Sequence, residues 1–426
     1  MQLIAGLERL QGVLLMREAS SSLSVYVVGG AVRDALLGVA VKDHDYVVVG
    51  STVEEMLSLG YKAVGKDFPV FLHPKTHDEY ALARTERKTG KGYKGFTVYA
   101  SSDVTLEEDL ARRDFTMNAI AKSSDGQLFD PYQGQLDIQN KTIRHVGEAF
   151  VEDSVRILRA ARFSARFPDF IIAPETMLLM QQMVADGEVD ALVVERVWQE
   201  LSKGLMEVKP SRMFEVLRAC GALQKILPEV DKLWGVPQPE KYHPEIDTGV
   251  HVMMAIDYAA KKDFSLPVRL ATLLHDLGKV TTAKELLPRH VGHDVRGAKL
   301  VKEVSKRLRI PNDCAQLAYM VAKFHIKEHK VMQMKPSTLL TFLIELDAIR
   351  QPGRFESFLQ ACESDTRGRL ELESIAIPQA ALMRKALKAA NIINAGEVAK
   401  QQNSAEQIKQ AIFEARLVAV KAALQQ

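Results

Sequence analysis

The sequence predicts an α+β protein, in which a head of mixed strands and helices is followed by a long, all-helical remainder. Short apolar runs that end at glycine alternate with helical patterns over about the first 130 residues. A long helical pattern runs from Val151 to about Arg166. After it, strand patterns are sparse and helical runs dominate to Gln426, interrupted by proline-containing turns. The chain has 426 residues, of which 47% are hydrophobic and 26% charged. This size and composition predict two to four globular domains.

The head elements follow from local patterns. Apolar runs predict strands at residues 25–28, 46–49, 70–73 and 79–83. A helical run from Ala31 to Leu37 lies between the first two strands, and Ser51 or Thr52 can cap a second helix. Residues 1–24 precede the first strand without the basic region of a signal peptide, so we expect an extension there.

Net charge, cysteine spacing and the length of the apolar stretches limit the classes of protein that fit this sequence. The net charge of +2 neither indicates nor excludes nucleic-acid binding, so any such surface must be local. Cys220, Cys314 and Cys362 are too scattered for a metal-ligand pair or a disulfide framework, which favours a reducing cytoplasm. No apolar stretch approaches the roughly 18 residues of a membrane span.

A glycine pair and two aspartates suggest phosphate chemistry in the head. Gly29 and Gly30 lie between a strand and a helix, where the backbone can approach a phosphate and Arg33 can add a contact. Asp43 and Asp45 share one face at the start of the next strand, and two carboxylates can hold Mg²⁺ together with nucleotide phosphates. Taken singly, such features are more often plain turns and solvated loops.

The order of glycine turn, helix and Asp-x-Asp strand resembles the DNA polymerase β-type nucleotidyltransferases. The resemblance implies that Asp43 and Asp45 are catalytic, with two metals that activate a 3′-hydroxyl and stabilise the leaving pyrophosphate. It also implies a third carboxylate from a neighbouring strand. Glu79 is a candidate, although a surface glutamate is the commoner case.

Further motifs narrow the resemblance to the class II tRNA nucleotidyltransferases and their poly(A) polymerase relatives, most closely the bacterial enzymes with an HD domain. The stretches that carry it are VVGGAVRD (27–34), KDHD (42–45), EDLARRDFTMNA (108–119), DPYQG (130–134) and RHV (144–146). The resemblance implies that Gly30, Arg33 and Arg113 bind the nucleotide. It also implies that helices over about 175–232 form a neck and body that grip tRNA.

Asp153 and Arg156 offer a protein template for nucleotide choice. If both lie on one helix, their spacing puts them on one face, where a salt-bridged solvent stripe is the plain interpretation. A carboxylate only accepts and a guanidinium only donates hydrogen bonds, so the pair matches cytosine and adenine but not uracil or guanine. The family resemblance implies this template role, and it implies nucleotide contacts for Arg159 and Arg162.

A basic stretch in the head could contact RNA or triphosphate. Its members are Arg84, Arg87, Lys88, Lys91 and Lys94, which lie within eleven residues. Such a patch would bind phosphates without sequence preference, and the alternative is a solubilising loop.

In the helical part, His275 and Asp276 end an apolar helix just before Gly278, and His251 lies on an earlier helical stretch. A buried histidine is more often simply hydrogen-bonded than bound to metal. The pattern His-Asp-x-Gly-Lys with an upstream histidine, however, resembles the HD-superfamily phosphohydrolases. It implies that His251, His275 and Asp276 bind a metal, and such mixed ligands suit Mn²⁺, Co²⁺, Ni²⁺ or Fe²⁺ as well as Mg²⁺.

The closing aspartate of this HD motif has two candidates. We prefer Asp365 to Asp347. Three more histidines could be extra ligands or substrate contacts, namely His290, His293 and His325.

The resemblance as a whole implies an enzyme that adds C, C and A to tRNA 3′ ends from CTP and ATP. It implies Mg²⁺ in the polymerase β-type nucleotidyltransferase head, and phosphatase and 2′,3′-cyclic phosphodiesterase activity with a divalent transition metal in the HD domain. We expect a cytoplasmic monomer or homodimer without membrane association. The expected domains are an extension (1–24), a head (25–150), an all-α neck and body (151–240), an HD domain (245–370) and a helical tail (371–426).

Two alternatives remain. Poly(A) polymerases of this family usually have two basic residues before a phenylalanine, whereas this chain has an acid at the second place, in GKDF (65–68). An HD phosphohydrolase with a degenerate RNA-binding head is disfavoured by the intact Asp43 and Asp45 pair and by Asp153 and Arg156.

Overall fold

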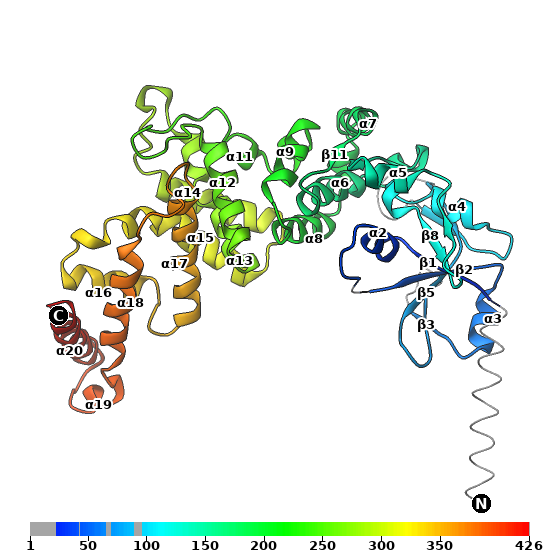
Figure 1. The fold of residues 1–426 in the computed structure, drawn as a ribbon. Helices are drawn as coiled ribbons and strands as arrows, with labels where there is room; N and C mark the ends of the chain where they lie inside the picture. Colours follow the sequence, from blue (N-terminus) through cyan, green and yellow to red (C-terminus); the bar gives the residue numbers. More distant parts are fainter. Residues whose placement is uncertain (1–22, 42, 65–69, 89–95, 426) are drawn as a thin grey trace, which may run out of the picture. The chain divides into compact units, whose positions relative to one another are not determined.

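The computed structural model describes residues 23–41, 43–64, 70–88 and 96–425 (Figure 1). Two compact units divide at Val193 and Val194, and each is described by itself. Apart from residues 23 and 24, the predicted extension lies outside the described residues, and residue 24 already belongs to the first strand. None of the described helices is long and apolar enough to cross a membrane.

The head is built on one mixed sheet. Among the described residues, seven strands pair in the order β3-β4-β5-β2-β1-β8-β9. Their bounds are β1 Ser24–Val28, β2 Asp45–Val49, β3 Lys62–Val64, β4 Val70–Leu72, β5 Glu79–Leu82, β8 Ala121–Ser123 and β9 Leu128–Phe129. A separate hairpin pairs β6 (Thr85–Lys88) with β7 (Phe96–Tyr99). The four predicted strands are confirmed to within one residue at each end.

Helices cover both faces of this sheet. Successive residues of β2 point to opposite faces, so neighbouring residues pack in different apolar clusters. Val47 packs in one apolar cluster with Leu110, while Val48 packs in another with Met56 and Phe71. Thr52, one of the two predicted caps, accepts the N–H of Glu55. The helices of this first unit are α2 Gly30–Leu36, α3 Val53–Ser58, α4 Leu106–Ala111, α5 Gly134–Gln139, α6 Val155–Arg166 and α7 Pro174–Ala185. Two further short strands, β10 Thr142–Ile143 and β11 Ile171–Ile172, pair in parallel.

The start of α6 corrects one prediction. The sequence predicted a helix from Val151, with Asp153 on it, but a short 3-10 helix over Glu148–Glu152 comes first and Asp153 is extended (φ −125°, ψ 103°). The Asp153 carboxylate accepts the N–H of Val155 at 3.1 Å. This bond satisfies one of the unpaired amides at the helix N-terminus, which is why the carboxylate is stable there.

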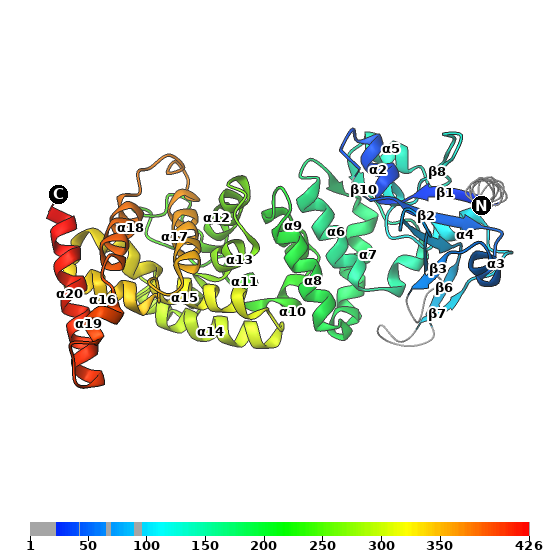
Figure 2. The ribbon, with the colours of Figure 1, turned by 90° about the horizontal axis from the view of Figure 1, so that it is seen from below.

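The second unit is all helical, as predicted (Figure 2). Its helices are α8 Val194–Leu205, α9 Ser211–Ala219, α10 Ala222–Ile226, α11 Pro228–Asp231, α12 Thr248–Lys261, α13 Leu266–Leu274, α14 His293–Arg307, α15 Asn312–His329, α16 Pro336–Glu345, α17 Pro352–Arg367, α18 Pro378–Asn391, α19 Ala395–Ala399 and α20 Ala405–Gln425. The buried helix α13 packs against α12, α15 and α17, while α20 packs against α16 and α18.

Two glycines let backbones of the second unit approach closely. A Cβ on Gly278 would lie 1.9 Å from the main-chain oxygen of His293, at the start of α14. A Cβ on Gly368, just after α17, would lie 2.3 Å from the Cα of Ala255 on α12. Side chains at these positions would push the backbones apart, so Gly278 is needed where the 3-10 helix after α13 meets α14, and Gly368 where the end of α17 meets α12.

Candidate functional sites

The predicted catalytic residues of the head gather at one end of the sheet. Asp45 opens β2 and is paired in register with Val28 on β1 and with Glu79 on β5. Side chains at paired positions point to the same face, so Asp45 and Glu79 are neighbours there. Gly29 directly follows Val28. Asp43 lies two residues before β2, and both aspartates are exposed, so they are accessible to a metal and a phosphate.

Arg113 lies against the glycine turn. Gly29 has a φ of +69°, and a Cβ on it would lie 3.0 Å from Nη1 of Arg113. Nη2 of Arg113 donates to the buried Asp109, while its buried Nε has no partner among the described residues. Burial raises the pKa of Asp109, but the charges of Arg112 and Arg113 outweigh this and hold it below its usual value. The Arg113 guanidinium is thus held beside the glycine turn, and its Nε–H group makes no hydrogen bond there.

Arg33 is buried beside the glycine turn and makes contacts within the head. Its guanidinium, only 3% exposed, donates to Asp34 at 2.7 and 2.9 Å and to Asn118 at 2.6 Å. It also lies 5.0 Å from the ring centre of Phe163 and 5.2 Å from that of Phe167. The three hydrogen bonds use three of the five N–H groups of the guanidinium. The nucleotide contact predicted for Arg33 stays a prediction.

The arginines of α6 connect this helix to the head motifs. Nε of Arg159 lies 2.7 Å from Asp114, and Nη2 of Arg166 lies 2.7 Å from Asp34. Burial raises the pKa of Asp114, but Arg159 and the amide of Asn118 more than offset it, so this carboxyl stays ionised. Ion pairs that a nucleotide could exchange thus line the head side of α6.

The two members of the predicted template are not on one helical face. Arg156 donates to the main-chain oxygens of Ala149 (2.7 Å) and Arg112 (2.6 Å), while Asp153 caps the helix. Arg162 is buried, with its guanidinium 4.6 Å from the ring centre of Phe163. The nucleotide contacts predicted for Asp153, Arg156, Arg159 and Arg162 stay predictions.

In the second unit, the four predicted HD residues meet although they come from three helices. His251 lies on α12, His275 and Asp276 directly follow α13, and Asp365 lies on α17. Nε2 of His251 lies 3.1 Å from Asp365, and Nε2 of His275 lies 3.1 Å from Asp276 and 3.7 Å from Asp365. All four side chains are buried.

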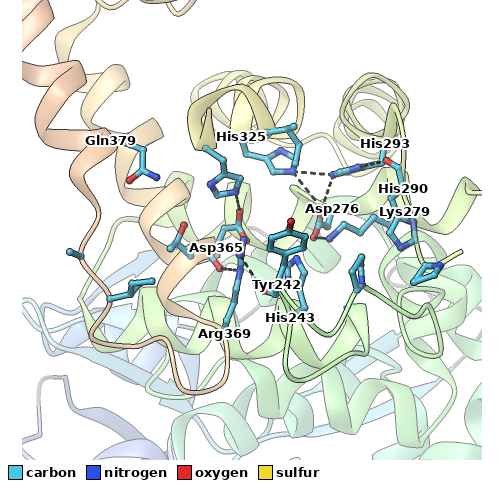
Figure 3. Close-up of a pocket in the computed structure, with 17 residues that line it drawn as sticks. Tyr242, His243, Asp276, Lys279, His290, His293, His325, Asp365, Arg369 and Gln379 are labelled. Carbon is cyan, nitrogen blue, oxygen red and sulfur yellow. Dashed lines mark hydrogen bonds and ion pairs between the residues drawn. The ribbon is translucent and has the colours of Figure 1, made fainter. Parts of the chain in front are cut away.

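His293 on α14 and His325 on α15 extend this group. Their Nε2 atoms lie 3.3 and 3.6 Å from Oδ1 of Asp276 and 3.2 Å from each other (Figure 3). Nδ1 of each faces a main-chain oxygen, of His290 and Val321 respectively, as Nδ1 of His275 faces that of Thr272. A proton on Nδ1 leaves the Nε2 lone pair pointing inward.

These residues fit a divalent metal. Two Nε2 lone pairs at 3.2 Å repel each other unless a cation or a proton lies between them. Nε2 of His275 and Oδ1 of Asp276 are buried and lack a hydrogen-bond partner among the described residues. Burial lowers the pKa of His325 to about 4. Burial acts in the same direction on His275, but the carboxylates of Asp276 and Asp365 outweigh it and raise the pKa of that ring to about 10. A metal bound there would replace the proton on His275, because a metal ligand must be neutral.

The other two candidates differ in where they lie. Asp347 forms ion pairs with Arg350 (2.7 Å) and Arg354 (3.1 Å) instead of facing the histidines. His290 lines the cavity beside the HD residues, where its ring nitrogens lie within hydrogen-bond distance of Pro237 O and of Thr282. The structure therefore brings Asp365, His293 and His325 to the HD residues and places His290 in the cavity wall, whereas Asp347 lies apart from them.

Comparison with known proteins assigns the family. Family models match at residues 25–144 (Poly A polymerase head domain), 169–233 (Probable RNA and SrmB- binding site of polymerase A) and 248–349 (HD domain). The "Multifunctional CCA protein" of Methylobacillus flagellatus is 63% identical over 401 residues, covering 94% of this chain and 98% of the relative. That of Herminiimonas arsenicoxydans is 59% identical, with 94% and 98% covered. The chain belongs to the multifunctional CCA proteins.

Solved structures show the same fold. A CCA-adding enzyme with CTP has a TM-score of 0.61 at 22% identity, with 97% of this chain and 94% of that chain covered. A Thermotoga maritima CCA-adding enzyme complexed with tRNA has a TM-score of 0.56 at 21% identity, with 97% and 95% covered. The head and the helical units of a CCA-adding enzyme are thus present in this member of the family.

A cavity of about 430 Å³ opens beside the HD residues of this multifunctional CCA protein (Figure 3). Asp276 and Asp365 lie in its wall. Lys279 pairs with Asp276 at 2.6 Å, and Arg369 pairs with Asp365 at 2.9 Å. Cations beside a metal site can neutralise a bound phosphate ester.

Sequence patterns had not indicated several residues of this wall. Arg369 follows the closing aspartate in a short Arg-Gly-Arg run, which could have identified it. Tyr242 and His243 come from a loop without a motif, and Gln379 comes from α18, in the predicted tail. The predicted boundary at residue 370 thus cuts through the lining of the cavity, and the domain boundaries stay predictions.

Two head segments with predicted roles cannot be compared. Residues 65–69, which include GKDF, and residues 89–95, which include Lys91 and Lys94, lie outside the described residues. The contact of the basic stretch with RNA or triphosphate stays a prediction.

Proposed function

We propose that this chain adds C, C and A to tRNA 3′ ends from CTP and ATP without a nucleic-acid template, and that its HD site hydrolyses phosphate esters, including 2′,3′-cyclic phosphates. The observation that carries the first part is the convergence of Asp45, Glu79 and the Gly29 turn at one end of the head sheet. The buried cluster of histidines and aspartates carries the second part. Relatives named "Multifunctional CCA protein" support both.

In the head, Asp43 and Asp45 would hold Mg²⁺. Their exposed carboxylates fit an ion that prefers oxygen ligands and keeps waters and phosphates around it. The ion would make a 3′-hydroxyl more acidic and neutralise the leaving pyrophosphate. Arg113 orients the triphosphate beside Gly29, whose missing side chain leaves room for the Arg113 guanidinium.

Nucleotide choice rests on Asp153 and Arg156. The carboxylate accepts from the exocyclic amine of cytosine or adenine, and the guanidinium donates to the adjacent ring nitrogen. To do so, Arg156 exchanges a hydrogen bond to Ala149 or Arg112 for one to the base. Arg159 and Arg162 contact the rest of the nucleotide.

In the HD site, His251, His275, Asp276 and Asp365 would hold a divalent transition metal, with His293 and His325 beside them. Mixed imidazole and carboxylate ligands favour ions such as Mn²⁺, Co²⁺ or Ni²⁺ over Mg²⁺. The ion would lower the pKa of a bound water enough to supply hydroxide near neutral pH. Lys279 and Arg369 hold the phosphate group of the substrate in the cavity.

The partners follow from this function. The chain binds tRNA, ATP and CTP, acts in the cytoplasm where tRNA matures, and is a monomer or a homodimer. Its three cysteines are free and buried, which suits a reducing compartment.

Nucleotide incorporation separates this function from its alternatives. Purified protein is incubated with tRNA lacking its 3′ end and with each radiolabelled nucleotide alone and in pairs. We expect incorporation of C, then of A after C, and none of U or G. Long runs of A from ATP alone would identify a poly(A) polymerase. Loss of all incorporation with retained hydrolysis would identify an HD phosphohydrolase with an inactive head.

A further inference from the structure

Glu245 lies behind the HD site, on the loop between α11 and α12. Its side chain is 2% exposed. One carboxylate oxygen, Oε1, lies 2.9 Å from Nδ1 of His251 and 3.2 Å from Nδ1 of His243. The other oxygen, Oε2, accepts the N–H of Leu370, next to Arg369, at 3.4 Å. One buried carboxylate thus contacts a candidate metal ligand, a residue of the cavity wall and the segment after α17.

The backbone around Glu245 is held in an unusual conformation. The next residue, Ile246, has a φ of +59°, a region that β-branched residues rarely adopt. Its main-chain oxygen accepts the N–H of Gln238 at 2.8 Å, and the Asp247 side chain accepts the N–H of Val250 at the start of α12. A strained residue persists only where its surroundings fix it, and here the turn directs Glu245 inward.

The chemistry of an imidazole ligand explains why a carboxylate is useful there. If Nε2 of His251 binds a metal, the proton of the ring must sit on Nδ1. That nitrogen is buried and makes no hydrogen bond of good geometry among the described residues, and Oε1 of Glu245, 2.9 Å away, is the acceptor that it faces. Nδ1 of His275, of His293 and of His325 faces a main-chain oxygen, to which it can donate this proton, whereas Nδ1 of His251 faces a carboxylate. A carboxylate fixes the ring and makes it a stronger donor to the metal.

We propose that Glu245 is a positioning residue of the HD site: it holds the Nδ1 proton of His251 and so directs the Nε2 lone pair of that ring toward the metal. The same oxygen orients His243 at the wall of the cavity. This inference rests on the proposed metal site. It adds to that site a residue that the HD motif does not contain.

An alternative use of the same atoms is a separate ion between His243, Glu245 and His251, whose ligand atoms lie within 4.8 Å of one another. His251 would then bind two ions through its two ring nitrogens, which requires loss of both ring protons. A neutral imidazole with one proton on Nδ1 needs no such step, so the hydrogen-bonded arrangement is favoured.

The test measures metal affinity in the full-length protein. Metal is removed with a chelator, and Mn²⁺ and Ni²⁺ are titrated by calorimetry into the wild type, Glu245→Gln, Glu245→Asp and Glu240→Gln. Glu240 is an exposed glutamate of the same loop and serves as the matched control. We expect Glu245→Gln to weaken binding by about 10- to 100-fold, Glu245→Asp to recover part of the loss, and Glu240→Gln to bind as the wild type does.

Further readouts separate the possible failures. Nucleotide addition and the thermal unfolding of the chelated protein should be the same in Glu245→Gln as in the wild type. A change in either would reveal a folding defect, and the metal affinity of Glu245→Asp would then be the test of the inference. Wild-type affinity in Glu245→Gln would overturn the inference. The inference would also be overturned if Glu245→Gln bound one metal ion fewer than the wild type and bound the remaining ions with unchanged affinity. Glu245 would then be a direct ligand of the lost ion. If the wild type binds no metal, the proposed HD function fails instead.

Discussion

The side chains of the HD site and those of the head are prepared for their ligands in different ways. At the HD site, buried histidines direct ring nitrogens toward two carboxylates and toward each other, an arrangement that a bound cation or a proton stabilises. In the head, by contrast, the arginines already have partners, as Arg159 has in Asp114 and Arg156 in two main-chain oxygens. Under the proposed function, a nucleotide would exchange hydrogen bonds with this network, which costs less than ordering free side chains.

A prediction at this scale concerns nucleotide choice. Asp153→Ala and Arg156→Ala should blur the preference for CTP and ATP over UTP and GTP, because each removes one of the two groups that read the base edge. Losing such a contact costs roughly 1–3 kcal/mol, or about 5- to 150-fold in discrimination. Incorporation rates of the four nucleotides on tRNA lacking its 3′ end provide the measurement.

Arg156 also ties Ala149 to Arg112, so its removal can loosen the head. Thermal unfolding of both variants is therefore recorded as a control. A folded variant that keeps the full wild-type preference would show that nucleotides are selected by other groups.

At the scale of elements, close approach of helices assembles the HD site. Gly368 lets α17 lie against α12, which brings Asp365 to His251. The sequence predicted these helices because their apolar residues recur with helical spacing. It could not predict Glu245 or Gln379 at the site, since a loop and the helix α18 reach it through tertiary packing that no local pattern encodes.

The same limit applies in the head. The strands were predictable from alternating apolar runs, and Asp45 and Glu79 fall at paired strand starts as the motif suggested. The start of α6 was not predictable in this way, because a 3-10 helix precedes it and the extended Asp153 accepts the N–H of Val155 from outside the helix. The contact of Arg33 with Asn118 was likewise not predictable, since the two residues are 85 positions apart in the sequence.

Gly353 lies within α17 and Gly368 directly follows it, so the two glycines give a matched test of this packing. Gly368→Ala should destabilise the second unit by about 1–3 kcal/mol and reduce HD hydrolysis, because its Cβ would overlap α12. Gly353→Ala, where nothing lies within 4 Å of the added Cβ, should leave both unchanged or slightly raise the stability. Thermal unfolding and hydrolysis of a 2′,3′-cyclic nucleotide are measured for each. Equal effects of the two changes would contradict the role given to Gly368.

At the scale of the whole molecule, two sites with different ligands share one chain. The head offers carboxylates alone, whereas the HD site combines imidazoles with carboxylates. Hard ions such as Mg²⁺ suit the first set, and borderline transition ions suit the second. The metal requirements of the two activities should therefore differ.

Metal removal tests this difference. After treatment with a chelator, both activities should be lost. Mg²⁺ alone should restore nucleotide addition, while hydrolysis should need Mn²⁺, Co²⁺ or Ni²⁺. Full recovery of hydrolysis with Mg²⁺, and no gain from the transition ions, would argue against imidazole ligands in the HD site.

The central claim is that this chain carries two independent active sites, one for CCA addition and one for hydrolysis. The most direct measurement runs both assays on the same preparations of the wild type, Asp45→Ala and Asp276→Ala. Asp45→Ala should lose nucleotide addition by roughly 10³-fold or more and keep hydrolysis, because several kcal/mol of metal-dependent stabilisation disappear from the head alone. Asp276→Ala should lose hydrolysis and keep addition. Parallel loss of both activities in either variant, with normal circular dichroism, would contradict the account.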